Sequence, residues 1–322
     1  MSNKLLALIK QSKSFFIAGH YHPDGDALGS ALALAMGLKK LKKEAVVYNR
    51  DPVPYNLRFL PHSDWITSKM PARKFDVAIM VDCAQPKRIS DAFEQSLKNG
   101  NFGTLVCIDH HILHQKVGDI DWIDAAQAST GCVIWKLLKK MNLHKSKEVA
   151  SLVYTTLVVD TGSFRYSNTT TEVLRLAADL VALGADPWTV ARNLEESDPI
   201  QRYHLMELAL KSLAIQEKGL FASMELTREM FKKSGAKEED AEEFSGIPRS
   251  LRGVEVAALF RESEEGKVKV SLRSKLTVDV AKIAGLFGGG GHKHAAGCNF
   301  TKGLEDAKQK IRAAVRLSLR GA

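Results

Sequence analysis

The chain has 322 residues, of which 45% are hydrophobic and 26% charged, and this composition excludes fibrous, collagen-like and disordered proteins. Subtracting 37 Asp and Glu from 46 Lys and Arg leaves a net charge of +9, which favours a polyanionic partner without identifying one. The sequence shows neither a signal-peptide core nor a run of the ~20 apolar residues that a membrane span needs, so we expect a cytoplasmic protein without membrane contact.

The first half alternates short apolar runs with helical patterns. Strand patterns cover residues 14–19, 45–48, 77–82 and 105–109. Between the first two, apolar residues recur at helical spacing from Leu28 to Leu41. Alternation of strands and helices predicts an α/β fold with a parallel sheet and helices on both faces. From Ser129 to Leu183 the pattern is mostly helical.

The second half predicts a smaller domain. Residues 186–211 have the pattern of a helical connection, which places a domain boundary near residues 190–210. Strand patterns follow at 220–224, 254–261 and 268–273, interleaved with helical patterns at 226–233, 238–245, 279–286 and 303–318. This order predicts a mixed α/β domain of about 100 residues.

Acids and histidines follow four apolar segments, each interpreted as a strand. They are His20, Asp24 and Asp26 after the first run, Asp82 after the third, Asp109, His110 and His111 after the fourth, and Asp160 after a later segment, 152–159. In an open α/β sheet, the ligand crevice lies at the carboxyl ends of the strands, so these side chains should converge. Each alone is typical of a helix cap or a turn, but four such coincidences favour a site.

Converging carboxylates would repel one another and take up protons unless cations lay between them. Carboxylate and imidazole groups, without a thiolate ligand, suit Mn²⁺ or Mg²⁺. Two such ions that share a carboxylate are typical of phosphoryl-transfer sites. We therefore expect two divalent ions, Mn²⁺ first and Mg²⁺ as the alternative.

Four segments resemble, in order, the metal-binding motifs of the DHH phosphoesterase superfamily: HYHPDGDALGS (20–30), VDCA (81–84), IDHH (108–111) and VVDTGSF (158–164). SLRS (271–274) and FGGGGHKHAAG (287–297) resemble the DHH-associated substrate-binding domain. The layout is most similar to the branch of bifunctional oligoribonucleases and 3′-phosphoadenosine 5′-phosphate phosphatases. We therefore place a catalytic domain at 1–190, a helical linker at 191–212 and a substrate-binding domain at 213–322.

The resemblance also implies roles for the individual residues. One ion would be held by His20, Asp24 and Asp82. The other would be held by Asp26, Asp82, His110 and Asp160, with Asp82 shared. His111 would face the substrate as a phosphate contact or proton donor, and Asp109 would orient the imidazole.

Three positions depart from the family pattern. His22 stands where Asn is common, as an extra polar wall or ligand. Cys132 stands where an acidic residue is common, and Leu276 replaces a small residue that often follows Arg-Ser-Lys.

The glycine run before His292 suggests a binding site for the substrate. Glycine tolerates positive φ, so the amides of Gly289, Gly290 and Gly291 are predicted to form an anion-binding nest, with a flexible turn as the competing interpretation. Arg273, Ser274 and His292 would add contacts to a phosphate. Arg88 and Arg249 are further candidates, although isolated arginines are usually solvated.

The family resemblance implies exonucleolytic hydrolysis of short single-stranded RNA, and of adenosine 3′,5′-bisphosphate (pAp) to AMP and phosphate. Linear or cyclic dinucleotides (pGpG, pApA, c-di-AMP) are alternative substrates, and a non-catalytic RNA- or nucleotide-binding module is the alternative from another class. The GGGGH segment argues against a manganese-dependent pyrophosphatase. We expect neither upstream sensory domains nor the extra domains of nucleases that act on long DNA. The oligomeric state stays open, with a homodimer as one option.

Overall fold

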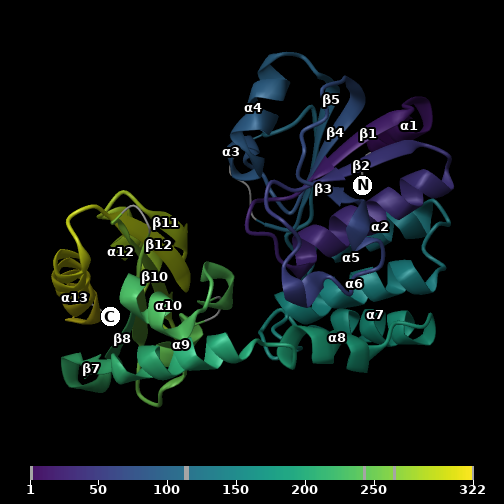
Figure 1. The fold of residues 1–322 in the computed structure, drawn as a ribbon. Helices are drawn as coiled ribbons and strands as arrows, with labels where there is room; N and C mark the ends of the chain where they lie inside the picture. Colours follow the sequence, from purple (N-terminus) through teal and green to yellow (C-terminus); the bar gives the residue numbers. More distant parts are fainter. Residues whose placement is uncertain (1–2, 112–115, 242–243, 264–265, 321–322) are drawn as a thin grey trace. The chain divides into compact units, whose positions relative to one another are not determined.

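The computed structural model describes residues 3–111, 116–241, 244–263 and 266–320 (Figure 1). The chain divides into two compact units, Met1–Ser197 (unit 1) and Asp198–Ala322 (unit 2). The division lies within the segment 191–212 that we predicted as a linker. Among the described residues, no helix has both the length and the apolar character that crossing a bilayer requires.

Unit 1 contains a parallel sheet of six strands in the order β3-β2-β1-β4-β5-β6. The strands are β1 (Ser14–Ala18), β2 (Glu44–Tyr48), β3 (Ile66–Thr67), β4 (Phe75–Val81), β5 (Phe102–Asp109) and β6 (Ile120–Ile123). The four predicted strands of the first half are confirmed as β1, β2, β4 and β5. The two strands that the sequence did not indicate, β3 and β6, are short and lie at the edges.

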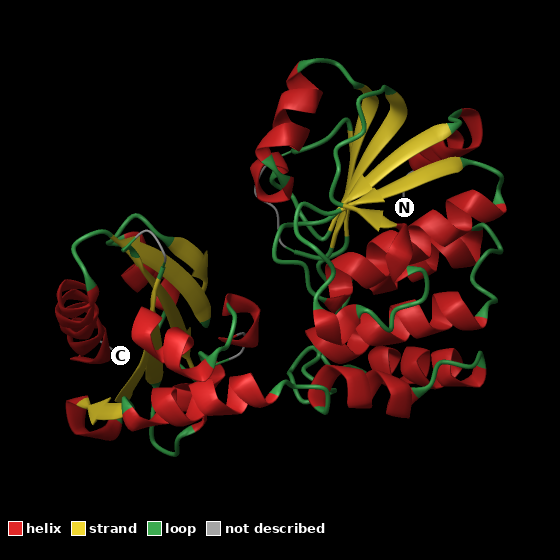
Figure 2. Cartoon of the chain, in the orientation of Figure 1, coloured by secondary structure: helices red, strands yellow, loops and turns green. Residues whose placement is uncertain are grey.

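Helices cover both faces of this sheet, as predicted (Figure 2). They are α1 (Asn3–Gln11), α2 (Gly25–Lys40), α3 (Pro86–Ile89), α4 (Asp91–Lys98), α5 (Thr130–Lys140), α6 (Lys147–Asp160), α7 (Thr171–Ala182) and α8 (Pro187–Glu195), with the 3₁₀ turns η1 (Tyr55–Leu57) and η2 (Ser63–Trp65). Within β1, Phe15 and Ile17 join the core under α2, whereas Phe16 packs with Phe93 of α4. Burial on both faces explains why β1 is continuously apolar.

Helix α6 corrects one of our expectations. The segment Leu152–Val159, interpreted as a strand, is helical, so Asp160 ends a helix rather than a strand. Residues 152–158 are buried without interruption, and α6 packs against α2, α5 and α7. Because burial on all sides removes the apolar–polar periodicity, a buried helix cannot be distinguished from a buried strand by pattern.

Unit 2 contains a mixed sheet in the order β11-β12-β10-β9-β8-β7, in which only the described pair β8–β9 is parallel. Its strands are β7 (Ala214–Gln216), β8 (Phe221–Leu226), β9 (Val256–Glu262), β10 (Val268–Ser274), β11 (Gly290–His292) and β12 (Ala295–Phe300). Its helices are α9 (Ile200–Lys211), α10 (Arg228–Ser234), α11 (Gly246–Ser250), α12 (Val280–Gly285) and α13 (Leu304–Arg320), with η3 (Glu217–Gly219) and η4 (Glu238–Ala241). The predicted mixed α/β fold of this half is confirmed.

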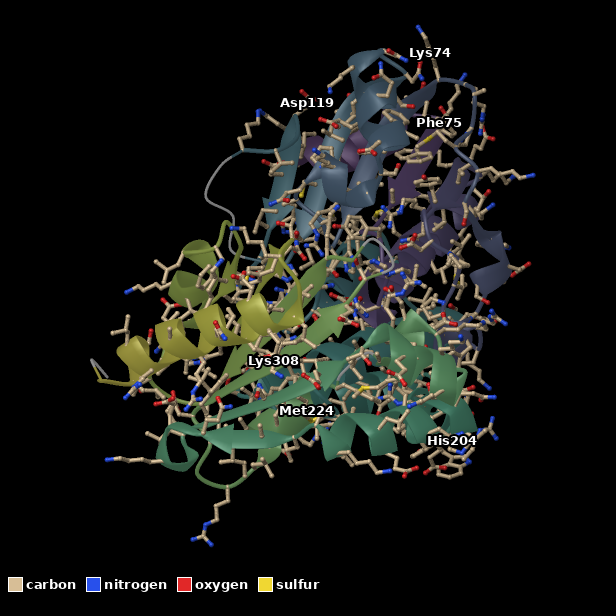
Figure 3. All side chains as sticks on the ribbon, turned by 60° about the vertical axis from the view of Figure 1, so that its left-hand side comes forward. Lys74, Phe75, Asp119, His204, Met224 and Lys308 are labelled. Carbon is tan, nitrogen blue, oxygen red and sulfur yellow. The ribbon has the colours of Figure 1, made fainter. Side chains whose placement is uncertain are left out.

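The two faces of the second sheet have separate cores. Val270 and Leu272 of β10 share one core with α12 and α13. On the other face, Met224 of β8 packs with Leu205 and Ala209 of α9, and Figure 3 labels Met224 on this sheet. Helix α9, which we predicted as part of the linker, therefore contributes to the core of unit 2.

Candidate metal centre

Three neighbouring strands bring the candidate residues of unit 1 to one edge of the sheet. Strands β1, β4 and β5 lie side by side and run parallel, so their carboxyl ends meet. His20 follows β1, Asp82 follows β4, and Asp109 is the last residue of β5. The expected convergence at the carboxyl edge is therefore observed for these three segments.

The first group of side chains consists of His20, Asp24 and Asp82. The Nε2 atom of His20 lies 3.4 Å from Asp82 Oδ2 and 3.8 Å from Asp24 Oδ2. Asp24 also caps helix α2, because its Oδ1 accepts hydrogen bonds from the amides of Asp26 and Ala27 at 3.0 and 2.9 Å. The cap and the cluster thus use different oxygens of one carboxylate.

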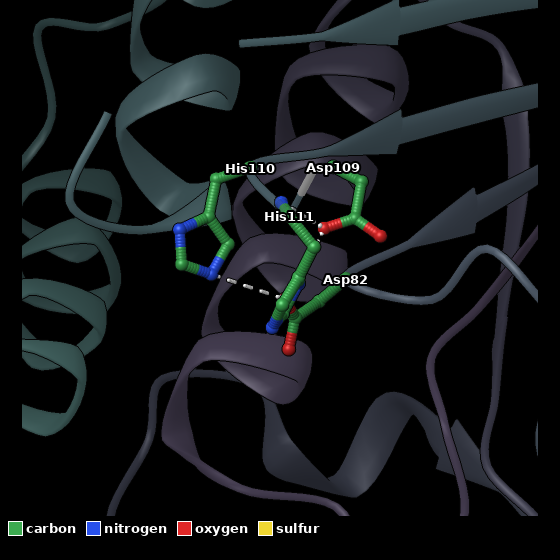
Figure 4. Close-up of side chains that lie close together, drawn as sticks. All are labelled: Asp82, Asp109, His110 and His111. Atoms are coloured by element: carbon green, nitrogen blue, oxygen red, sulfur yellow. Dashed lines mark hydrogen bonds and ion pairs between the residues drawn. The ribbon is translucent and has the colours of Figure 1, made fainter. Parts of the chain in front are cut away.

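The second group consists of Asp26, His110 and Asp160. The Nε2 atom of His110 lies 3.1 Å from Asp160 Oδ2 and 3.8 Å from Asp26 Oδ2. It also lies 3.7 Å from Asp82 Oδ1 (Figure 4). Asp82 therefore presents one oxygen to each imidazole and joins the two groups.

Asp82 also belongs to a third group, with Asp109, His110 and His111. Its backbone has a φ of 53°, a left-handed conformation that is uncommon for residues other than glycine and that often occurs at functional sites. Thr130 donates a hydrogen bond to Asp82 Oδ1 at 3.1 Å. The carboxylate is thus held in place by a strained backbone and a neighbouring hydroxyl group.

The tautomers of the two imidazoles follow from their hydrogen bonds. Nδ1 of His20 lies 2.9 Å from the carbonyl oxygen of Tyr21, and Nδ1 of His110 lies 3.3 Å from that of Gln127. Because a carbonyl oxygen only accepts, each Nδ1 must carry a proton. In neutral imidazoles, the Nε2 lone pairs would then face carboxylates. Such an arrangement requires a positive charge, either a proton or a metal ion.

The shifts in the pKa values of the acids and of His20 also indicate that the site requires a positive charge. Burial and repulsion from Asp26 raise the pKa of Asp82 and of Asp160 well above the usual range. Burial alone would lower the pKa of His20, but hydrogen bonds to Asp24 and Asp82 raise it to about 11. Ligand atoms bound to one small divalent ion lie about 3 Å apart, close to the 3.1–3.8 Å separations in both groups. The residues therefore fit a pair of divalent cations.

His111 differs from the other two histidines. Its Nδ1 lies 2.7 Å from Asp109 Oδ1, which also accepts the amide of His111 at 2.9 Å (Figure 4). This hydrogen bond raises the pKa of His111, although burial opposes the shift. The Asp109 carboxylate is buried, whereas His111 is 43% exposed. The arrangement fixes an imidazole with increased basicity at the surface of the site.

The amino end of helix α5 completes the site, a role that we did not predict from the sequence. Asp26 accepts hydrogen bonds from the amides of Thr130 and Gly131 at 2.7 and 2.9 Å, and from Ser30 Oγ at 3.1 Å. Amides in the first turn of a helix have no partner within the helix, so they favour an anion such as the Asp26 carboxylate. The signal in the sequence was Ser129-Thr130-Gly131 before an apolar helical run, a typical helix start.

The three positions that depart from the family pattern, His22, Cys132 and Leu276, lie in different environments. The amide of His22 donates to Asp51 at 2.7 Å, its side chain is 61% exposed, and it joins none of the three groups found among the described residues. Cys132 is buried in α5, and burial raises the pKa of its thiol to about 11. Cys83 and Cys107 are also buried, in the core shared with Phe93 of α4, and burial raises the pKa values of their thiols. Leu276 is exposed in unit 2.

The predicted substrate-binding residues lie mainly in unit 2. Arg273 alternates along β10 with the buried Leu272 and Ser274, so it lies on the face opposite α12 and α13. Ser274 donates a hydrogen bond from its buried hydroxyl to the carbonyl of Val278 at 2.7 Å and contacts His294 Nδ1 at 3.0 Å. The hydroxyl therefore fixes the neighbouring loop, which differs from the expected phosphate contact.

The glycine run also differs from the expectation of a nest. Gly289 donates its amide to the carbonyl of Ala284, which closes the end of α12, and a Cβ at this position would lie 2.1 Å from the carbonyl of Gly297. Gly290 and Gly291 belong to β11 and pair with β12, as does His292. The run is thus a helix end followed by a hairpin strand. The amide of Gly289 is used within the chain, so it is not available as part of an anion-binding nest.

Arg88 and Arg249 lie in different units. Arg88 is exposed in α3, near the carboxyl edge of the sheet, because its carbonyl accepts the amide of Tyr21 at 2.7 Å. Arg249 is partly buried in α11 of unit 2.

Known proteins resemble this chain in sequence and in fold. Residues 14–157 match the DHH family, N-terminal domain, and residues 218–320 match the DHHA1 domain. The chain is 36% identical over 309 residues to the bifunctional oligoribonuclease and PAP phosphatase NrnA of Thermus thermophilus, covering 94% of this chain and 90% of that protein. It is 26% identical to the protein of the same name from Bacillus subtilis, covering 93% of each.

A solved structure also resembles this chain in its fold. An exopolyphosphatase-related protein from Bacteroides fragilis superposes with a TM-score of 0.90 at 27% identity, covering 97% of this chain and 94% of that one. The two matched domains occur in the order that the motifs predicted. The chain is therefore a hydrolase of the DHH phosphoesterase family, with an N-terminal DHH domain and a C-terminal DHHA1 domain.

Proposed function

We propose that this chain is a metal-dependent phosphoesterase that removes nucleotides from short RNA and converts pAp to AMP and phosphate. The observation that carries the proposal is that Asp82 joins two imidazole–carboxylate groups whose Nε2 atoms face carboxylates. The substrate class is supported by the relatives from Thermus thermophilus and Bacillus subtilis, both named bifunctional oligoribonuclease and PAP phosphatase. The net charge of +9 suits polyanionic substrates.

In this proposal, His20, Asp24 and Asp82 hold one ion, and Asp26, Asp82, His110 and Asp160 hold the other. Bound divalent ions supply Lewis acidity and lower the pKa of water. We propose Mn²⁺, with Mg²⁺ as the alternative, because the ligands combine imidazole with carboxylate. The amides of α5 hold Asp26 in one orientation. These contacts keep the carboxylates in place against their mutual repulsion.

His111 takes the role of proton or hydrogen-bond donor to the phosphoryl group. The hydrogen bond to Asp109 raises the pKa of His111, which favours the protonated imidazole that such a donor needs. Asp109 fixes the ring through Nδ1 and stabilises its positive charge. In unit 2, we propose that Arg273 and His292 bind a substrate phosphate, to which a guanidinium group can donate two hydrogen bonds.

A substrate panel tests the proposal directly. We expect the purified full chain with Mn²⁺ to hydrolyse pAp and RNA of two to five nucleotides, and to act slowly on a 24-nucleotide RNA. Pyrophosphate, pGpG and c-di-AMP serve as competing substrates in the same assay. Activity on pyrophosphate alone, or binding of RNA and pAp without turnover, would contradict the proposal and favour one of its alternatives.

Metal removal should abolish activity and lower stability. We expect excess EDTA to lower the hydrolysis of pAp at least about 100-fold and Mn²⁺ to restore it. A ligand at 100 times its Kd stabilises the native state by about 2.7 kcal/mol, so Mn²⁺ should also raise the melting temperature. Calorimetry and a pAp assay on the same samples measure both effects, and full activity in EDTA would exclude the metal site.

Replacing Arg273 by alanine should weaken substrate binding without affecting the metal. We expect KM for pAp to rise about tenfold while the metal content, measured by mass spectrometry, stays constant. Arg312→Ala is the control, because Arg312 lies on α13 and pairs with Glu217. An unchanged KM in Arg273→Ala would remove this arginine from the proposed binding site.

A further inference from the structure

A second polar cluster continues the catalytic edge beyond the metal groups. It consists of Tyr21 and His22 after β1, and Arg50 and Asp51 after β2. The two strands are parallel, with Ala18 opposite Tyr48, so the segments that follow them lie together. The side-chain amide of Asn49 donates to the carbonyl of His20 at 2.9 Å and ties the segments to each other. The cluster is therefore built onto the candidate ligand His20.

The backbone of Tyr21 is fixed on both sides. Its amide donates to the carbonyl of Arg88 at 2.7 Å, and its carbonyl accepts Nδ1 of His20 at 2.9 Å. The guanidinium carbon of Arg50 lies 4.3 Å from the centroid of the Tyr21 ring. This cation–π contact places a planar cation on an aromatic ring that directly follows a candidate metal ligand.

Asp51 fixes the plane of that guanidinium group. Arg50 donates from Nε to Asp51 Oδ1 at 3.0 Å and from Nη2 to Oδ2 at 3.3 Å. Asp51 Oδ2 also accepts the amide of His22 at 2.7 Å. The Arg50 side chain remains 44% exposed. An ordered, partly exposed guanidinium plane of this kind is a stacking surface for nucleobases.

In the proposed reaction, only one of the two substrates has a second base that such a surface could bind. In pAp, water adds to the 3′-phosphorus, the P–O3′ bond breaks, and AMP and phosphate form. In pApA, the same bond breaks and two AMP molecules form. The substrates thus share the first nucleoside, and only RNA carries a second nucleoside on the transferred phosphoryl group. That nucleoside must lie beyond the metal centre.

We infer that Arg50, lying on Tyr21, is a stacking surface for the base of the second nucleotide, and that it favours RNA over pAp as a substrate. This inference rests on the proposed function and adds a specificity-determining residue to it. Asp51 and the amide of His22 act as positioning groups, because they hold the guanidinium plane. His22 thus takes part in positioning Arg50, through Asp51, and does not belong to the metal groups found among the described residues.

The chain contains a matched control at the opposite edge of the same sheet. The guanidinium carbon of Arg73 lies 4.3 Å from the ring centroid of Phe75, at the amino end of β4, and Arg73 forms an ion pair with Glu44 (Figure 3 labels Phe75). The side chain of Arg73 is 43% exposed. Arg73→Ala removes the same kinds of contact as Arg50→Ala, but far from the carboxyl edge.

The experiment compares kcat/KM for pApA, for pAp, and for a pApA analogue that lacks the second base. We expect Arg50→Ala to lower the ratio of kcat/KM for pApA to that for pAp about tenfold, on the scale of one lost stacking contact. Arg73→Ala should leave this ratio unchanged. The analogue should already be about tenfold slower than pApA with the unmodified protein, and Arg50→Ala should not slow it further.

Two further variants separate stacking from charge. Arg50→Lys keeps the charge but loses the planar group, so its ratio of kcat/KM for pApA to that for pAp should be as low as in Arg50→Ala. Tyr21→Phe keeps the aromatic ring, so its ratio should equal that of the unmodified protein. Equal losses with pApA and the analogue, or an unchanged ratio in Arg50→Ala, would overturn the inference. If the unmodified protein hydrolyses neither pAp nor pApA, the proposed function fails instead. Melting temperatures and metal content confirm that each variant is folded and loaded.

Discussion

Asp82→Asn is expected to lower kcat with pAp at least about a thousandfold while the fold is retained. Asp82 is the side chain that faces both His20 and His110. An amide keeps the shape of the carboxylate but can no longer present two anionic oxygens. Both metal groups therefore lose a ligand at once. Steady-state kinetics with Mn²⁺ and a metal analysis of the purified variant measure the loss.

The same substitution should stabilise the metal-free protein. Burial and Asp26 raise the pKa of Asp82, so the native state loses stability as the pH rises above the ordinary pKa of a carboxyl group. We expect metal-free Asp82→Asn to melt at or above the temperature of the metal-free parent at pH 8, and to gain little from Mn²⁺. Asp240→Asn is the control, since Asp240 is equally buried, at 4% exposure, but lies in unit 2. Normal turnover in Asp82→Asn would contradict the shared-ligand arrangement.

Among the substitutions, Gly131→Ala should have the second-largest effect, because it lowers stability and activity together. A Cβ at Gly131 would lie 2.0 Å from Thr156 Oγ1 and 2.7 Å from Thr156 Cβ, so α5 must shift away from α6. We expect a loss of about 1–3 kcal/mol in the free energy of unfolding. Because the amides of Thr130 and Gly131 hold Asp26, we also expect kcat to fall about tenfold or more.

Gly285→Ala is the matched control for this substitution. Gly285 is also helical, in α12, and a Cβ there would have no neighbour within 4 Å. Alanine favours the helix by about 1 kcal/mol relative to glycine, so this variant should be slightly more stable and fully active. Urea denaturation and pAp kinetics measure both variants. If Gly131→Ala were as stable and active as Gly285→Ala, close packing of α5 on α6 would not be needed to position Asp26.

The central strands of unit 1 could be predicted because a short, continuous stretch of sequence carries the pattern of each strand. A strand such as β1 is buried on both faces, and its continuous apolar run ends at the polar residues that form the site. The rule that parallel strands end at the same edge of a sheet is enough to predict that His20, Asp82 and Asp109 lie near one another. The parallel direction of the strands and the position of the site at their carboxyl ends therefore followed from the pattern, whereas the order of the strands did not.

The contacts made by α5 and α6 could not be predicted in the same way. Asp160 was placed correctly near the other acids, but on the wrong kind of element, because the buried α6 lacks periodicity. The pairing of Asp26 with the first turn of α5 joins residues more than 100 positions apart. Such a contact depends on how α2 and α5 pack, which no local pattern encodes. The hairpin β11–β12 was missed for a similar reason, since its glycines resemble a loop.

The buried cysteines determine how this protein should respond to thiol reagents. Cys83 follows β4, Cys107 lies in β5 and Cys132 lies in α5, and all three are buried, which raises the pKa values of their thiols. Alkylating agents and oxidants react with exposed thiolates, and this site offers them none among these residues. Inactivation by such reagents would therefore report transient unfolding rather than chemistry at the catalytic edge, and it would serve as a probe of how often the native state opens.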